Sequence, residues 1–169
     1  HHTERLGLPF DLVDRLTGPA IGRPKSATFR TLDVVGLDTF VHVVRDSAEA
    51  LTDDPWHRYY RVPAWLQGLV ERGALGQKSG AGVYRKEGRR ILVLDAASGE
   101  YRPSDAQPDP HLGEILGERD PRRRLAALRA CDHPQAEFLL ACLRDLFHYC
   151  AVHLGEIAHS ARDLDLALR

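Results

Sequence analysis

Apolar residues recur at three- and four-residue spacing along most of this 169-residue chain, and this pattern constrains it to a mostly helical fold. The longest such stretch runs from about residue 135 to 159, directly after Asp132-His133-Pro134. Its apolar stripe is broad enough to predict a helix that is buried against several neighbours. The stripe consists of Leu139, Leu143, Leu146, Cys150, Leu154 and Ile157, and it is widened by Phe138, Cys142, Phe147, Ala151 and Val152.

Shorter helices are predicted at about residues 8–17, 28–36, 39–51 and 64–71. Each has apolar residues on one side and ends near a glycine or a proline, which stop helices. After residue 111 the chain is helical again, and Asp120-Pro121 is typical of a capping residue followed by proline in the first turn. In the helix at 28–36, the residues predicted to be buried are Phe29, Leu32, Val34 and Val35. The helix at 39–51 is predicted from the spacing of Phe40, Val43, Val44, Ala48 and Leu51.

Residues 83–102 break the helical pattern and predict a small β-hairpin about Gly88, with a third short strand through Tyr101. The prolines between residues 103 and 110 are typical of a linker. We therefore expect an all-α fold with a small β-hairpin insertion, organised as two units. The first unit covers residues 3–105 and the second covers residues 111–169.

The composition excludes several classes of function. Hydrophobic residues make up 43% of the chain, and the net charge is −1, which gives no reason to expect nucleic acid or an anionic membrane as partner. No apolar run approaches the roughly 20 residues that span a bilayer. Cys142 and Cys150 would lie about 12 Å apart in a helix, too far for a disulfide. With Cys131, they are interpreted as small buried hydrophobes in a reducing cytoplasm.

The glycine-rich stretch from Gly76 to Tyr84 has two interpretations. A phosphate cradle would need a strand before it and a helix after it, so that backbone amides converge on the anion. Here a helix comes before it and a strand follows. A tight turn that lets two backbone segments approach closely is therefore the favoured interpretation.

Two clusters of polar residues could carry chemistry. Asp33 and Asp38 flank Gly36 and could act as an acid–base pair, although helix capping and buried hydrogen bonds to backbone amides are the more ordinary role. His153 and Glu156 share a helix face, but His148 diverges from it and no third metal ligand is evident. We therefore predict no metal site. From the residues alone, the sequence predicts a helical domain without chemistry of its own.

The segment from Arg23 to Thr39, with its Leu32-Asp33-Val34-Val35-Gly36-Leu37-Asp38 run, resembles the C-terminal domain of 3-hydroxyacyl-CoA dehydrogenases. The Gly-x-Lys-x-Gly-x-Gly-Val-Tyr run at 76–84 is similar to a second signature of the same family. Two signatures in the family's order are more specific than either alone. Ala27-Thr28 departs from the family pattern, because Gly-Pro usually stands before the aromatic residue.

The resemblance implies a fold shared with 6-phosphogluconate dehydrogenase C-terminal domains. It also implies oxidation of a 3-hydroxyacyl-CoA to a 3-ketoacyl-CoA, with hydride passing to NAD, in fatty-acid β-oxidation. The family's catalytic His, Glu and Asn lie upstream of Thr3, so the resemblance assigns no catalytic, cofactor-binding or metal residue here and implies that the chain is inactive alone. The residues that it places near the acyl-CoA are Arg23, Pro24, Phe29, Asp33 and Asp38.

The implied partners are a nucleotide-binding domain of the same chain, the acyl-CoA substrate and a second copy in a homodimer, as in large multifunctional bacterial proteins of fatty-acid oxidation. Residues 161–169 resemble residues 10–16, with Asp165 at the position of Asp14, which indicates the start of a second helical unit. We expect the apolar stripe of the long helix to be covered by dimerisation or by the first unit. The alternative function is a non-enzymatic helical interaction module.

Overall fold

Most helices begin where a proline or a capping side chain completes the first turn. The Asp109 carboxylate accepts hydrogen bonds from the first amides of helix α6 (Pro110–Gly117), and Asp120 does the same for α7 (Pro121–Ala130). The His133 side chain accepts a hydrogen bond from the amide of Gln135 at the start of α8 (Pro134–Ile157). The Asp120-Pro121 prediction is therefore confirmed.

The computed structural model describes residues 1–167 of the chain.

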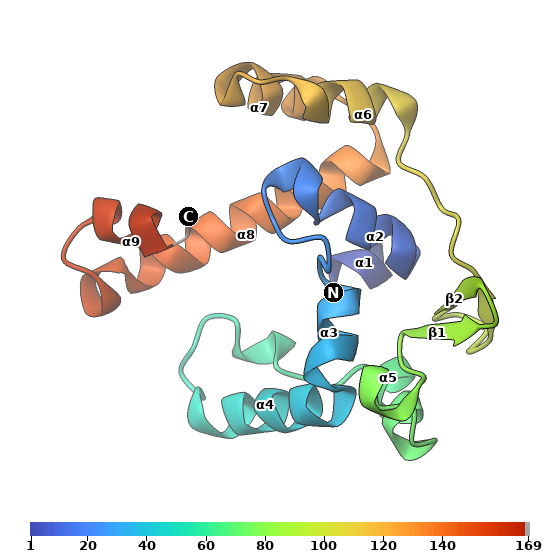
Figure 1. Cartoon of the computed structure of the whole chain (residues 1–169). Helices are drawn as coiled ribbons and strands as arrows, with labels where there is room; N and C mark the ends of the chain where they lie inside the picture. The colour runs from blue at the N-terminus through green and yellow to red at the C-terminus, as the bar shows by residue number, and fades with distance from the viewer. Residues whose placement is uncertain (168–169) are drawn as a thin grey trace.

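The described residues form a mostly helical protein with one small antiparallel sheet (Figure 1). Short 3-10 turns occur at Pro19–Ile21, His57–Tyr59 and Gln77–Ser79. The first helices are α1 (His2–Arg5), α2 (Phe10–Leu16), α3 (Phe29–Val35), α4 (Leu37–Ala50) and α5 (Ala64–Glu71). The strands are β1 (Tyr84–Glu87), β2 (Arg90–Leu94) and β3 (Tyr101–Pro103). The later helices are α6 (Pro110–Gly117), α7 (Pro121–Ala130), α8 (Pro134–Ile157) and α9 (Ala161–Ala167).

The three strands pair in the order β1-β2-β3, and both pairs are antiparallel. Tyr84 lies opposite Val93, and the turn between β1 and β2 contains Gly88, whose φ of 59° lies in the region that favours glycine. Val93 and Leu94 are buried and attach the sheet to the helical core. The predicted hairpin and third strand are therefore confirmed.

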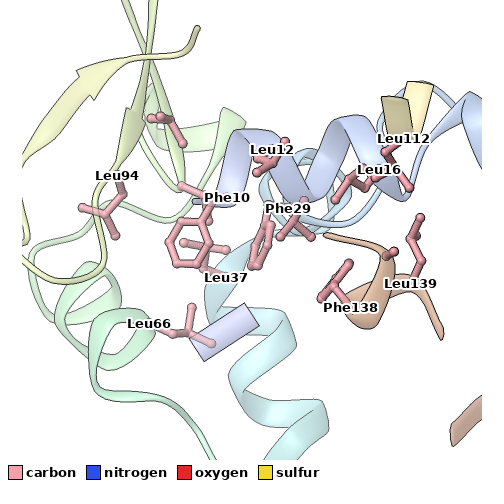
Figure 2. Packing of buried hydrophobic residues seen from close by; sticks show 14 of the residues in the cluster. Phe10, Leu12, Leu16, Phe29, Leu37, Leu66, Leu94, Leu112, Phe138 and Leu139 are labelled. Carbon is pink, nitrogen blue, oxygen red and sulfur yellow. The ribbon is translucent and has the colours of Figure 1, made fainter. Parts of the chain in front are cut away.

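Helix α2 lies at the centre of the hydrophobic core (Figure 2). At one end of α2, Phe10 lies near Leu37 and Leu66, and at the other end Leu16 lies near Leu112 and Phe138. One cluster of buried side chains thus contains residues from both sides of the proline linker. The division into units at 3–105 and 111–169 stays a prediction.

Two valine side chains that we predicted to be buried, Val34 and Val35, are exposed. In α3, the buried side is set by Phe29 and Asp33, one turn apart, so Val34 and Val35 point away and are 59% and 51% exposed. In α4, Leu37 and Val41 form the buried side. Val43 and Leu51, which belong to the apolar pattern that predicted this helix, are exposed.

Helix α8 is buried only along its first half. Ala136, Phe138 and Leu139 belong to the core, whereas Phe147 and Ile157 are 59% and 62% exposed. The prediction that the whole stripe packs against several neighbours is therefore wrong for the second half, which Figure 1 shows running away from the sheet towards α9. In that half α8 contacts the loop that follows α4: the centre of the Trp56 ring lies 5.1 Å from that of Tyr149, whose hydroxyl donates a hydrogen bond to Asp54 at 2.9 Å.

Helix α9 occupies the segment that resembles α2 in sequence, but it lies in a different environment. Asp14 in α2 is buried, whereas Asp165 in α9 is exposed. The last two residues of that sequence match, 168 and 169, lie outside the described residues. The second-copy interpretation stays a prediction.

Candidate functional site

The carboxylate of Asp33 connects α3 to the loop that precedes the sheet. Asp33 is only 4% exposed, and its two oxygens accept hydrogen bonds of 2.8 Å each from the amides of Val83 and Tyr84. The buried hydrogen bond to backbone amides is therefore the role that the structure supports. These two hydrogen bonds satisfy a carboxylate that is almost wholly removed from water.

Two glycines make this contact possible. A Cβ at Gly82 would lie 2.1 Å from Oδ1 of Asp33, and a Cβ at Gly76 would lie 2.3 Å from the Asp33 carbonyl oxygen. No side chain fits at either position while the backbones stay in place. The predicted tight turn between two closely approaching segments is confirmed, and β1 rather than a helix follows the loop.

A second buried carboxylate, Asp14, holds the start of α3. It accepts hydrogen bonds from the amides of Thr28 at 3.0 Å, Phe29 at 2.6 Å and Arg30 at 3.1 Å. The hydroxyl of Tyr84 donates a further hydrogen bond to Asp14 at 2.7 Å. Three amides at a helix start are thus satisfied by a side chain from another helix, in place of a local cap.

Tyr84 joins the two carboxylates, because its amide donates to Asp33 and its hydroxyl donates to Asp14. The Arg30 guanidinium lies 4.3 Å from the centre of the Tyr84 ring and stacks on it. We call Asp14, Asp33 and Tyr84 the carboxylate–tyrosine junction. It ties α2, α3 and the glycine-rich loop into one unit.

Burial dominates the ionisation of this junction. Desolvation raises the pKa of Asp14 and of Asp33 above the ordinary aspartate value, although hydrogen bonds from amides oppose the effect. Burial, together with the nearby Asp14, also raises the pKa of Tyr84. The tyrosine therefore stays protonated and keeps its role as a hydrogen-bond donor to Asp14.

Asp38 and Lys78 make a second link between the same two segments, close to solvent. The Lys78 ammonium donates to both oxygens of Asp38, at 2.6 and 2.7 Å. This hydrogen bond lowers the pKa of Asp38 below the ordinary aspartate value. Beside it, the Leu37 amide donates to the Leu75 carbonyl at 3.1 Å. Both sequence signatures thus meet at two points, one buried and one exposed.

The structure does not gather the five residues predicted to lie near a substrate around one cavity. Phe29 points into the core, with its ring centre 4.3 Å from that of Phe10. Arg23 and Pro24 lie exposed on the loop before α3. Arg23 lines a hollow of about 380 Å³ against α8, which the other four predicted residues do not line. Their role toward a substrate stays a prediction.

Asp14 was missing from the predicted site, although the sequence holds a signal for it. It follows Phe10 by four residues, so both lie on the same side of α2. A carboxylate on the apolar side of a helix needs hydrogen-bond partners. Tyr84 could not be named as that partner, because the two residues are 70 positions apart in the sequence.

The remaining polar clusters have local roles. His153 lies 3.4 Å from Asp54 and 3.5 Å from Glu156. Among residues 1–167, no group of three or more His, Cys, Asp or Glu side chains is arranged to hold a metal ion.

The three cysteines are free and half-buried, which is less burial than we predicted. No helix in the described part of the chain has both the length and the apolar character needed to cross a membrane.

Comparison with known proteins agrees with the resemblance of these segments. The family model described as "3-hydroxyacyl-CoA dehydrogenase, C-terminal domain" matches residues 6–86. A protein of Bacillus subtilis (strain 168), named "Probable 3-hydroxyacyl-CoA dehydrogenase", is 38% identical over 157 residues, which cover 93% of this chain and 20% of that relative. A protein of the same name in Deinococcus radiodurans is 45% identical over 85 residues, which cover 50% of this chain and 24% of that relative. No solved structure matches. The chain thus spans about one fifth of the length of the Bacillus relative.

Proposed function

The chain belongs to the 3-hydroxyacyl-CoA dehydrogenase family through residues 6–86, which match the C-terminal domain, and from this premise we propose that it is the substrate-side and assembly domain of an NAD-dependent enzyme. The proposed reaction oxidises the 3-hydroxyl of an acyl-CoA thioester to a ketone, and NAD accepts the hydride. We assign the reaction to fatty-acid β-oxidation in the cytoplasm.

One observation supports this proposal most directly. The two family signatures, separated in sequence, are joined in space by the hydrogen bonds from Val83 and Tyr84 to Asp33. The carboxylates at this contact are occupied by backbone amides or by Lys78. The junction therefore has a structural role and holds the two signature segments together. That fits a domain which positions substrate and excludes water, while the hydride chemistry takes place on a nucleotide-binding domain.

We propose that the loop bearing Arg23 and Pro24 lies against the acyl-CoA. Both side chains are exposed, and the junction holds the end of this loop because Asp14 binds the amides of Thr28 and Phe29. Asp38 contributes indirectly by holding Lys78. Phe29 acts as the core anchor of the loop, since its ring packs on Phe10.

The experiment is an assay with acetoacetyl-CoA and NADH, following the absorbance of NADH. The 169-residue chain is compared with the complete polypeptide encoded by the gene that contains it. We expect turnover only in a polypeptide that also has a strand followed by a Gly-x-Gly-x-x-Gly nucleotide-binding motif. Turnover by this chain alone, or a complete protein without dehydrogenase activity, contradicts the proposal.

A second function, a helical interaction module, is favoured by the apolar side chains on the outer half of α8. Phe147 and Ile157 are 59% and 62% exposed, and the half-buried Cys150 and Leu154 lie between them at three- and four-residue spacing on the same side of the helix. Exposed apolar side chains that gather along one helix commonly mark an association surface. The two functions are compatible if this surface forms a homodimer of the dehydrogenase.

A further inference from the structure

We infer that a hollow beside the carboxylate–tyrosine junction binds the phosphate groups of coenzyme A. Arg15 from α2, Lys25 from the loop and Arg30 from α3 line this hollow, whose volume is about 470 Å³. We call it the cationic hollow. The inference rests on the proposed function for the identity of the ligand, and on the geometry of these three side chains for the site itself.

The three cations are not neutralised by carboxylates. Within residues 1–167, none of them forms an ion pair with Asp or Glu. Arg15 and Lys25 are exposed, whereas Arg30 is held in place by its stacking on the Tyr84 ring. Arginine and lysine are the side chains that most often bind phosphate, arginine through a planar fork and lysine as a point charge.

The two carboxylates that border the hollow are already bound elsewhere. Asp11 accepts a hydrogen bond of 2.6 Å from the Arg102 guanidinium and one of 3.0 Å from the Ala106 amide. Asp14 is occupied by the amides of α3 and by the Tyr84 hydroxyl. Because Asp11 is paired with Arg102, the three cations of the lining face only the single carboxylate of Asp14, and the formal charge around the hollow is positive.

The size and polarity of the hollow favour a ligand larger than inorganic phosphate. Its volume lies within the range of about 300–1,000 Å³ that is usual for small-molecule sites. Ser104 adds a hydroxyl to the lining. By contrast, the larger hollow of about 650 Å³ beside Trp65 is lined by two carboxylates, Glu4 and Asp95, and by one cation, Arg102. Of the two, the cationic hollow is the one suited to an anion.

Coenzyme A is the most highly charged part of the proposed substrate, since it carries a 3′-phosphate and a diphosphate. NAD also carries a diphosphate, but it lacks the 3′-phosphate. Three cations from three separate segments match the more highly charged of the two ligands. The cationic hollow would then hold the nucleotide end of the thioester, while the acyl end extends toward the proposed nucleotide-binding domain.

The test is calorimetric titration of the 169-residue chain with free coenzyme A, NAD and inorganic pyrophosphate. The variants Arg15→Gln and Lys25→Gln each remove one exposed cation, and Arg129→Gln removes an exposed arginine of α7 as the matched control. We expect each of the first two to weaken coenzyme A binding about tenfold, as for loss of one charge-assisted hydrogen bond, and the control to leave it unchanged. Pyrophosphate should compete with coenzyme A, and NAD should bind more weakly. Circular dichroism verifies that all variants fold alike.

Two outcomes overturn the inference. The first is that coenzyme A fails to bind, or binds equally to all variants. The second is that NAD binds as tightly as coenzyme A and is weakened by the same substitutions, which excludes the assignment to coenzyme A. Either outcome is distinguishable from failure of the proposed function, because the complete protein can still be assayed for oxidation of 3-hydroxyacyl-CoA.

Discussion

The hydroxyl of Tyr84 donates a 2.7 Å hydrogen bond to the carboxylate of Asp14, which lies 70 positions earlier in the sequence. The same tyrosine donates its amide to Asp33. One residue of the glycine-rich loop thereby fixes two helices, α2 and α3, relative to the sheet. The stability of this contact can be tested one group at a time.

Replacing Tyr84 by Phe removes the hydroxyl and leaves the ring. One oxygen of Asp14 then keeps only the Arg30 amide as a donor, so the free energy of unfolding should fall by about 2 kcal/mol in urea titrations. Tyr59→Phe is the control, since the Tyr59 hydroxyl makes no hydrogen bond within the described residues. Equal effects of the two substitutions would show that the hydroxyl of Tyr84 is unimportant.

A methyl group at Gly82 should disrupt the loop. The new Cβ would lie 2.1 Å from Oδ1 of Asp33, so Gly82→Ala should lower the free energy of unfolding by about 3 kcal/mol or more, or prevent folding. Gly113→Ala in α6 is the matched control, because nothing lies within 4 Å of its Cβ position. The control should gain about 0.5–1 kcal/mol from helix propensity. A stable, soluble Gly82→Ala protein with an unchanged melting temperature contradicts the geometry.

The buried and exposed aspartates of the signatures should respond differently to Asn. In Asp33→Asn, one carboxylate oxygen becomes an NH₂ group, so the amide of Val83 or of Tyr84 loses its acceptor. We expect this loss to lower the free energy of unfolding by about 2–3 kcal/mol. Asp38→Asn weakens only a solvent-exposed pair with Lys78, and the midpoint of urea unfolding should hardly move. A larger shift for Asp38→Asn than for Asp33→Asn would reverse our assignment of their roles.

Stability should rise when the pH is lowered from neutral toward 3.8, the ordinary aspartate pKa. Burial raises the folded-state pKa of Asp14 and Asp33, so the folded chain binds more protons than the unfolded chain between 3.8 and those raised values. Their contribution is complete below 3.8 and is lost as the pH rises through the folded values. Below 3.8, aspartates with lowered pKa values, such as Asp11 and Asp145, reverse the trend.

Urea unfolding across this pH range measures the slope directly. The double variant Asp14→Asn/Asp33→Asn, if it folds, should lose the rise toward 3.8, and Asp38→Asn serves as the control that keeps it. A wild-type stability that falls steadily from neutral pH downward would disprove the role of the two buried carboxylates.

The exposed half of α8 should drive self-association. We expect multi-angle light scattering to show a dimer, and Phe147→Glu to shift it to a monomer, because a charge on the apolar face cannot be buried without a partner. Val43→Glu, which adds the same charge at an exposed apolar site on α4, is the control and should leave the dimer intact. A wild-type monomer at all concentrations tested contradicts the prediction.

Local features of the sequence were sufficient to predict where most elements begin and what type they are. Asp120 caps α7 with its own side chain, and Gly88 allows the turn between β1 and β2. The resemblance of two short segments was enough to indicate the family. Such features depend on residues within one turn of each other, so they can be recognised without knowing the rest of the fold.

Only the tertiary structure decided which side of each helix is buried and which polar groups meet. Val34 and Val43 are apolar yet exposed, and Asp14 is charged yet buried. The amides of Thr28 and Phe29 lie within reach of Asp14, and the Tyr84 hydroxyl reaches it from the end of the glycine-rich loop. Burial and hydrogen bonding of this kind depend on segments that are distant in the chain, and helical periodicity carries no information about which distant segment will pack there.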